Sequence, residues 1–115
     1  MIKLFEDFNQ DDENNNFIDS LDEYISACQR CIDDFGDEND HTDLIDSCED
    51  SINISQLVKD LINNDSKLLK SQCQIHKLSI KSCIEECKKF DDESTVSCIE
   101  SAKRCLVDCE NILDQ

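Results

Sequence analysis

Helix-breaking residues are almost absent from this chain of 115 residues, which has no proline and a single glycine, Gly36. Such a composition, together with abundant leucine, isoleucine, lysine and acidic residues, favours long helices over strands. Aromatic residues are also scarce, with five phenylalanines, one tyrosine and no tryptophan. Leucine, isoleucine and cysteine must therefore supply most of the core.

Positive charge is the second shortage. Eleven lysines and arginines face 28 acidic residues, and the net charge is −17. Phosphate backbones and anionic lipids repel such a chain, so we expect no nucleic-acid partner and no membrane partner. No run approaches the roughly 20 apolar residues of a membrane span. The acidic start, MIKLFEDFNQDDENNN, is unlike a secretory or organelle signal, and we expect a cytoplasmic protein.

Cysteine is the residue type present in excess, with nine copies. Five of them lie in the stretch CIEECKKFDDESTVSCIESAKRCLVDC, residues 83–109. A cytoplasmic chain keeps its thiols reduced, and an odd number of cysteines cannot all pair within one chain. Both arguments disfavour a disulfide framework.

The positions of the apolar residues predict an all-α fold. Residues 1–15 are expected to form an acidic N-terminal arm, either mobile or folded back as a short helix. Residues 16–115 are expected to form one domain of four helices. Because the predicted connections are short, the helices should run antiparallel, giving an up-down-up-down four-helix bundle with cysteines lining its core.

Three of the helices carry residues at alternating steps of three and four, which is the spacing of one helical face. The first face begins after Asn16, a predicted N-cap, ends before Gly36, and comprises Phe17, Leu21, Tyr24, Cys28, Cys31 and Phe35. The third helix contributes Leu69, Cys73, His76, Ile80, Cys83, Cys87 and Phe90. The fourth contributes Thr95, Cys98, Ala102, Cys105, Cys109 and Ile112.

The second helix is predicted to start near Asp40 and to carry Cys48 among leucines and isoleucines, with the weak helix former SINISQ in its middle. All nine cysteines are therefore expected to point inward.

Antiparallel neighbours mirror each other about the loop that joins them. The number of residues between a thiol and its loop therefore estimates the position of that thiol along the bundle axis. The estimate puts Cys87 level with Cys98, Cys31 level with Cys83, and Cys28 and Cys48 near Cys105. It puts His76 close to Cys109, with Cys73 deepest. The expected arrangement is a column of thiol layers rather than one compact quartet.

A column of thiols favours one metal over others. Structural zinc and iron–sulfur clusters need four ligands that converge on one point. Thiolates that are spaced along a tube suit several Cu(I) ions with bridging sulfurs. We therefore predict Cu(I) as the bound ion, with zinc as the second choice, and the candidate ligands are Cys28, Cys31, Cys48, Cys73, His76, Cys83, Cys87, Cys98, Cys105 and Cys109. For His76, a hydrogen-bonded core residue and a metal ligand are equally weighted interpretations. His41 is read as a solvated loop residue, with an entrance ligand as the alternative.

The cysteine pattern resembles that of the four-helix-bundle copper storage proteins over about residues 17–113. The resemblance rests on CQRC in the first helix, C-x2-H-x6-C-x3-C in the third and C-x6-C-x3-C in the fourth. The family's rhythm would put cysteine also at His76, Ile80, Thr95 and Ala102, so this chain is a cysteine-poor variant. The resemblance implies a core that fills with Cu(I), and an assembly of several bundles as a homo-oligomer.

These observations predict a protein that stores or buffers several Cu(I) ions on thiolates, with a copper chaperone as the expected donor, and that is not an enzyme. Catalytic cysteines are usually single and exposed, whereas these are many and inward. The alternative hypothesis is a degenerate helical bundle that serves as an interaction or thiol redox-sensing module with little or no metal binding.

Overall fold

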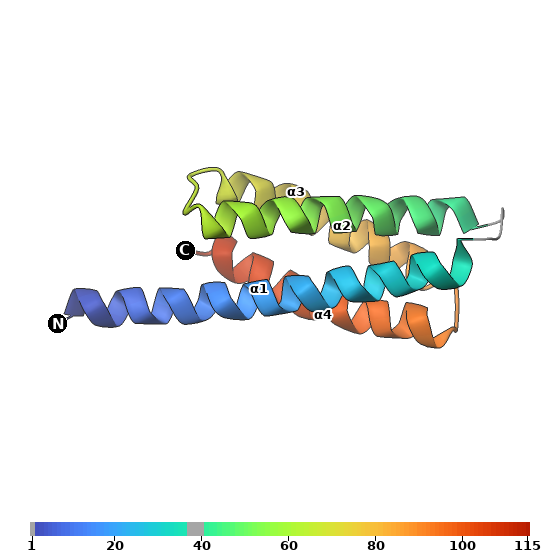
Figure 1. Cartoon of the computed structure of the whole chain (residues 1–115), viewed down its shortest axis with the longest axis horizontal. Helices are drawn as coiled ribbons and strands as arrows, with labels where there is room; N and C mark the ends of the chain where they lie inside the picture. The colour runs from blue at the N-terminus through green and yellow to red at the C-terminus, as the bar shows by residue number, and fades with distance from the viewer. Residues whose placement is uncertain (1, 37–40) are drawn as a thin grey trace.

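The computed structural model describes the backbone of residues 2–36 and 41–115, and the side chains of all these residues except 2–11. Four helices make up the described chain: α1 (Ile2–Phe35), α2 (Thr42–Asn63), α3 (Leu69–Cys87) and α4 (Glu93–Leu113). Helix α1 packs against α2 and α4, and α3 packs against the same two helices. Successive helices run in opposite directions (Figure 1). The predicted all-α, up-down-up-down four-helix bundle is confirmed.

Helix α1 begins much earlier than predicted. It is continuous from Ile2, so Asn16 lies within the helix and is not its N-cap. Without proline or glycine before Gly36, nothing in the sequence stops a helix from propagating towards the N-terminus. The 34 residues of α1 span about 51 Å at ~1.5 Å per residue, and the N-terminal end of α1 projects beyond the other helices (Figure 1). The division into an arm (1–15) and a bundle domain (16–115) stays a prediction.

The connections between helices follow the local sequence. After α1, the amide of Gly36 donates a hydrogen bond to the carbonyl oxygen of Ile32 at 2.7 Å. A Cβ atom at Gly36 would lie 2.6 Å from that oxygen, so glycine is the residue that fits. The predicted start of the second helix at Asp40 lies outside the described residues. The turn after α2 contains Asp65 with φ of 50°, a left-handed conformation that aspartate tolerates better than most residues.

The core contains the predicted faces. Every cysteine is fully buried, as are Phe17, Leu21, Tyr24, Val58, Ile80 and Ala102. The SINISQ segment of α2 is regular helix, and its Ser51 and Ser55 also point inward with no exposed surface. Among the described residues, no helix is long and apolar enough to cross a membrane.

Replacing Ile80 by alanine should lower the free energy of unfolding by about 2–5 kcal/mol, because a buried side chain is truncated in a packed core. Leu78 is on the same helix but is 70% exposed, so Leu78→Ala should cost less than about 1 kcal/mol. Urea unfolding of the reduced, metal-free chain, followed by circular dichroism, measures both. Equal losses for the two variants would contradict the packing of α3.

Candidate metal centre

Six cysteines form one buried cluster near the end of the bundle where α1 and α3 finish. We call this set the thiol cluster: Cys28, Cys31, Cys48, Cys83, Cys87 and Cys98. It contains two overlapping groups in which all sulfurs lie within 4.8 Å of one another. The first group is a quartet with one cysteine from each helix, Cys28, Cys48, Cys83 and Cys98. The second group is Cys31, Cys87 and Cys98, so Cys98 belongs to both.

Each member of the quartet lies one to two turns from a helix end at the same end of the bundle. Cys28 precedes the end of α1 at Phe35, and Cys83 precedes the end of α3 at Cys87. Cys48 and Cys98 follow the starts of α2 and α4 by similar distances. Because neighbouring helices are antiparallel, these four positions fall in one layer.

The sulfur spacing suits a soft metal ion. The sulfurs of Cys28 and Cys98 are 3.8 Å apart. Four sulfurs at about 2.3 Å from a common ion are separated by about 3.8 Å in a tetrahedron, and three in a plane by about 4 Å. The sulfurs of Cys28 and Cys98 are therefore already as far apart as two ligands of one ion, and the other sulfurs of each group lie within 4.8 Å.

The predicted column of thiols is wrong for these six residues, because four of them form a compact quartet. Cys28 and Cys48 do share a layer, and Cys87 does meet Cys98, as expected. However, Cys28 and Cys48 lie beside Cys98 and Cys83 rather than near Cys105. Counting residues from loops fixes the height of a residue only to about one helical turn, roughly 5.4 Å. Contact between sulfurs depends on much smaller displacements.

The thiols of the cluster differ in pKa, so some lose their proton more readily than others. The pKa of Cys83 is lowered, first by its hydrogen bond with Cys28, and the pKa of Cys31 is lowered, first by its hydrogen bond with Cys48. Hydrogen bonding to neighbouring thiols raises the pKa values of Cys28, Cys87 and Cys98. A few thiolates are thus stabilised by the protons of their neighbours, and further ionisation requires a cation.

No side chain of the protein provides that cation among the residues with described side chains. The buried polar residues there are serines, Thr95 and His76, and every lysine and arginine keeps contact with solvent. Buried charge must be neutralised by a partner or by a change of protonation. The cluster is therefore suited to exchange thiol protons for metal cations.

The remaining three cysteines and His76 form a separate group nearer the other end, which we call the histidine group. Nε2 of His76 lies 4.0 Å from the sulfur of Cys105. The thiol of Cys109 donates to the carbonyl oxygen of Cys73 at 3.0 Å. Interaction with Cys109 and burial raise the pKa of Cys73, and burial raises the pKa of Cys105.

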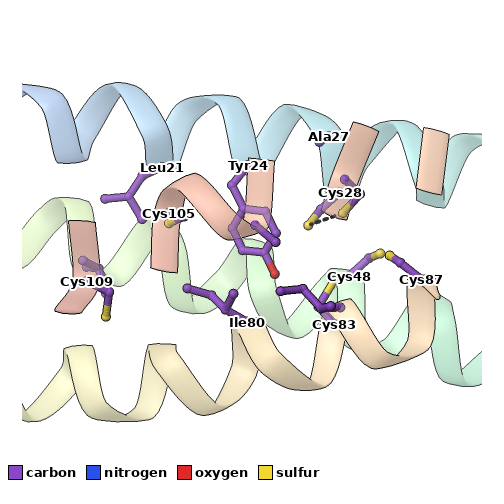
Figure 2. Packing of buried hydrophobic residues seen from close by; sticks show 14 of the residues in the cluster. Leu21, Tyr24, Ala27, Cys28, Cys48, Ile80, Cys83, Cys87, Cys105 and Cys109 are labelled. Carbon is purple, nitrogen blue, oxygen red and sulfur yellow. Dashed lines mark hydrogen bonds between the residues drawn. The ribbon is translucent and has the colours of Figure 1, made fainter. Parts of the chain in front are cut away.

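A layer without cysteine separates the two groups. Figure 2 shows Cys28, Cys48, Cys83 and Cys87 on one side of Tyr24 and Ile80, and Cys105 and Cys109 on the other, with Leu21 beside Cys105. The hydroxyl of Tyr24 donates to Ser51 at 2.9 Å, and Ser51 lies 3.3 Å from the hydroxyl of Ser79. This layer is internally hydrogen-bonded and needs no ion.

Sequence reasoning missed the inward-facing serines. Ser51 bonds to Tyr24, and Ser55 lies 3.1 Å from Nε2 of His76. The signal was present, because Cys48, Ser51, Ser55, Val58 and Ile62 repeat at steps of three and four. The polar character of the SINISQ segment concealed it.

Three rings lie at the end of the bundle next to the thiol cluster. Phe35 follows Cys31 by one turn, Phe90 follows Cys87, and His41 precedes α2. Their ring centroids are 5.0–5.1 Å apart in all three pairs. His41 is therefore partly buried against aromatic rings, unlike the solvated loop residue that was expected.

A four-helix bundle with a buried cluster of free thiols is a soft-metal-binding protein by its architecture. A sequence profile of the copper storage protein family, Csp, matches residues 10–114. The chain belongs to this family, and the resemblance noted in the sequence is confirmed.

Two solved structures have the same fold. Cu(I)-bound copper storage protein BsCsp3 is 20% identical, with a TM-score of 0.82, covering 88% of this chain and 98% of that one. Apo-Csp3 from Bacillus subtilis is 21% identical, with a TM-score of 0.78, covering 84% of this chain and 95% of that one. At this identity the likeness establishes the fold. No curated protein sequence is a match.

Alkaline titration tests the buried layer between the groups. Burial, and the neighbouring Cys83 and Cys28, raise the pKa of Tyr24 far above its ordinary value. An unfolded chain loses the phenol proton near pH 10, whereas the folded chain keeps it, so stability should fall as the pH rises above about 10. Tyr24 is the only tyrosine, and its ionisation is visible by ultraviolet absorbance.

We expect tyrosinate absorbance to appear together with the loss of helical circular dichroism, in one alkaline transition to which the buried thiols with raised pKa values also contribute. In Tyr24→Phe the dependence of stability on alkaline pH should be shallower. Tyrosinate that appears near pH 10 while the helical signal is intact would contradict the buried hydroxyl.

Proposed function

We propose that this protein stores several Cu(I) ions on cysteine thiolates inside the bundle, chiefly those of the thiol cluster. The observation that carries the proposal is the buried quartet, in which each helix contributes one cysteine, together with the second group that shares Cys98. A sulfur that belongs to two groups can bridge two ions. Membership of the copper storage family and the fold of Cu(I)-bound BsCsp3 support the same cargo.

Loading exchanges protons for ions. Each Cu(I) that binds replaces thiol protons, which leave to solvent, and its charge compensates the thiolates that remain. Because the sulfurs have no exposed surface, a bound ion is shielded from water and from oxidants. Burial and bridging together hold the ion in its reduced state, which suits storage better than catalysis.

The preference for Cu(I) over zinc cannot rest on the absence of a compact quartet, because the structure contains one. The quartet could surround one tetrahedral Zn²⁺, so geometry alone does not exclude zinc. Preference for Cu(I) rests instead on the soft, all-thiolate donor set and on the additional sulfurs of Cys31 and Cys87 beside the quartet.

The alternative, a thiol redox module, has one observation in its favour, because the sulfurs of Cys28 and Cys98 are only 3.8 Å apart. A redox-sensing cysteine needs access to its oxidant, and both thiols are fully buried. Storage accounts for six gathered thiols, whereas a redox pair accounts for two.

The proposal includes a cellular location, a copper donor and an oligomeric state. Nine free, buried cysteines suit a reducing compartment, and we place the protein in the cytoplasm on that ground. A reducing cytoplasm contains little free copper ion, so a copper chaperone is the proposed donor. Assembly of several copies into a homo-oligomer follows from the family resemblance alone.

The copper capacity of the chain tests the proposed storage function. At roughly two thiolates per ion with bridging, nine cysteines should hold about four or five Cu(I). Anaerobic titration of the reduced protein against a chromophoric Cu(I) chelator measures the number and the affinity. Binding of one ion or none would favour the alternative function.

Zinc provides a second test. The reduced chain should bind one Zn²⁺ at the quartet and release it when Cu(I) is added. Cys48→Ser removes a quartet ligand and should weaken zinc binding strongly, whereas Cys73→Ser, which removes an equally buried thiol outside the quartet, should not. A zinc ion that resists displacement by excess Cu(I) would overturn the metal preference.

The point at which Cu(I) enters the bundle gives a further prediction. Cys31 and Cys87 are the cluster members nearest the rings of Phe35 and Phe90 and the ends of α1 and α3. Their joint replacement by serine should slow initial Cu(I) uptake more than the joint replacement of Cys73 and Cys109, which also removes two thiols. Stopped-flow mixing with a Cu(I)–chelator complex gives the rates. Slower uptake in the Cys73/Cys109 variant would place the entrance at the other end.

A further inference from the structure

The outer face of α3 carries exposed apolar side chains beside a row of lysines. Leu68, Ile75 and Leu78 recur at steps of seven and three, which places them on one side of the helix, and they are 65%, 51% and 70% exposed. The amide of Gln72 donates a hydrogen bond to the carbonyl oxygen of Leu68, so the first helical turn includes Leu68. We call this surface the α3 face, and its members are Lys67, Leu68, Lys70, Ile75, Lys77, Leu78 and Lys81.

The α3 face is positively charged, although the protein is strongly acidic. Residues 66–84 contain four lysines and no acidic residue, whereas the whole chain has a net charge of −17. The ion pairs between described side chains involve other basic residues, so no lysine of the α3 face has an acidic partner among them. Lys70 donates instead to the backbone carbonyl oxygen of Gln115. An exposed apolar strip bordered by such lysines suits an acidic, amphipathic partner.

The first part of α1, residues 2–15, has the opposite charge, and we call it the N-terminal segment. It contains five acidic residues and one lysine, and its N-terminal end projects beyond the other helices (Figure 1). The buried face of α1 includes Phe17, Leu21 and Tyr24. Continued towards the N-terminus at the same steps, that face reads Asn14, Gln10, Asp7 and Lys3. Because these positions are polar, the pattern of the bundle core does not extend into the N-terminal segment.

The apolar residues of the N-terminal segment occupy different helical positions. Leu4, Phe5 and Phe8 are spaced as neighbours on one helix face. Phe8 is two residues from Gln10, which is about 200° around the helix axis at 3.6 residues per turn. The profile of the copper storage family begins at residue 10, so these three positions lie outside the region that the family accounts for. The N-terminal segment therefore has an amphipathic pattern that the core of its own bundle does not use.

The two surfaces match in charge, length and position. The four lysines give the α3 face a formal charge of +4, and the N-terminal segment has −4. Each extends about 21 Å along its helix at ~1.5 Å per residue. Helix α1 projects from the end of the bundle at which α3 begins (Figure 1). A two-fold axis that places two bundles end to end therefore lets each N-terminal segment lie antiparallel to α3 of the other copy.

We propose that two copies of this chain associate in this way, with the N-terminal segment of each docked on the α3 face of the other. The apolar residues of the segment cover Leu68, Ile75 and Leu78, and its carboxylates pair with the lysines beside them. Repulsion between two acidic chains is screened beyond about 8 Å at physiological salt, so the local attraction decides the contact. The inference goes beyond the storage of Cu(I) and does not depend on it.

Charge reversal on the α3 face tests the contact. Sedimentation velocity of the full-length, reduced, metal-free chain should show reversible assembly at micromolar concentrations. The triple variant Lys67→Glu, Lys77→Glu and Lys81→Glu makes the α3 face acidic, so it should repel the N-terminal segment of a second copy. We expect this variant to have half the apparent mass of the wild-type assembly at the same concentration, with the helical circular dichroism unchanged.

Charge reversal on the N-terminal segment gives the complementary variant. Glu6→Lys, Asp7→Lys and Asp11→Lys together make the segment basic, and this variant should also have half the apparent mass. Each variant repels a second copy of itself, because its two surfaces then have the same sign. In an equimolar mixture of the two variants both contacts again pair opposite charges, so the assembly should return to the wild-type mass.

Reversal of three other lysines is the matched control. Lys88→Glu, Lys89→Glu and Lys103→Glu change the net charge by the same amount outside the α3 face and should leave the assembly intact. Phe5→Ser with Phe8→Ser keeps every charge and should halve the apparent mass. A wild-type chain that stays monomeric, an assembly that these contact variants leave unchanged, or a mixture that stays monomeric would each overturn the proposal. None of these results bears on Cu(I) binding, so the proposed function is tested separately.

Discussion

The free-energy cost of placing a charged group in a buried core is the constraint on which this structure depends. All nine sulfurs are fully buried, and a thiolate there is stable only beside a proton donor or a cation. Neighbouring thiols stabilise the first thiolates, as the lowered pKa values of Cys83 and Cys31 indicate. Because no lysine or arginine is buried among the residues with described side chains, a metal cation is the partner that allows the rest to ionise.

The antiparallel arrangement of the helices gathers the buried thiols into one site. Four helices that alternate in direction bring positions near their ends into one layer, and each helix places one cysteine there. The remainder of the core, built from residues such as Leu21, Val58 and Ile80, is well supplied with aliphatic side chains. The helices can therefore pack without the metal, and the thiols can serve the ion rather than the fold.

Polar residues in the core organise the thiols into two regions. Tyr24, Ser51 and Ser79 satisfy one another through hydrogen bonds, so their layer neither attracts an ion nor requires one. On the far side, Ser55 satisfies only one nitrogen of His76. The hydroxyls of the first layer are therefore paired with one another, whereas Nδ1 of His76 has no hydrogen-bond partner among the described residues, although both regions are polar and equally buried.

The sequence by itself determined the four helices, their antiparallel order and the inward direction of every cysteine, because a heptad face depends only on local periodicity. It also indicated His76 as an inward residue of uncertain role. Only the tertiary structure decided that Cys28, Cys48, Cys83 and Cys98 meet, and that Ser51 and Ser55 join the core. Local periodicity says which face a side chain occupies. The sliding of one helix along another is set by packing across the whole interface, and contact between two sulfurs depends on that register to within a fraction of a helical turn.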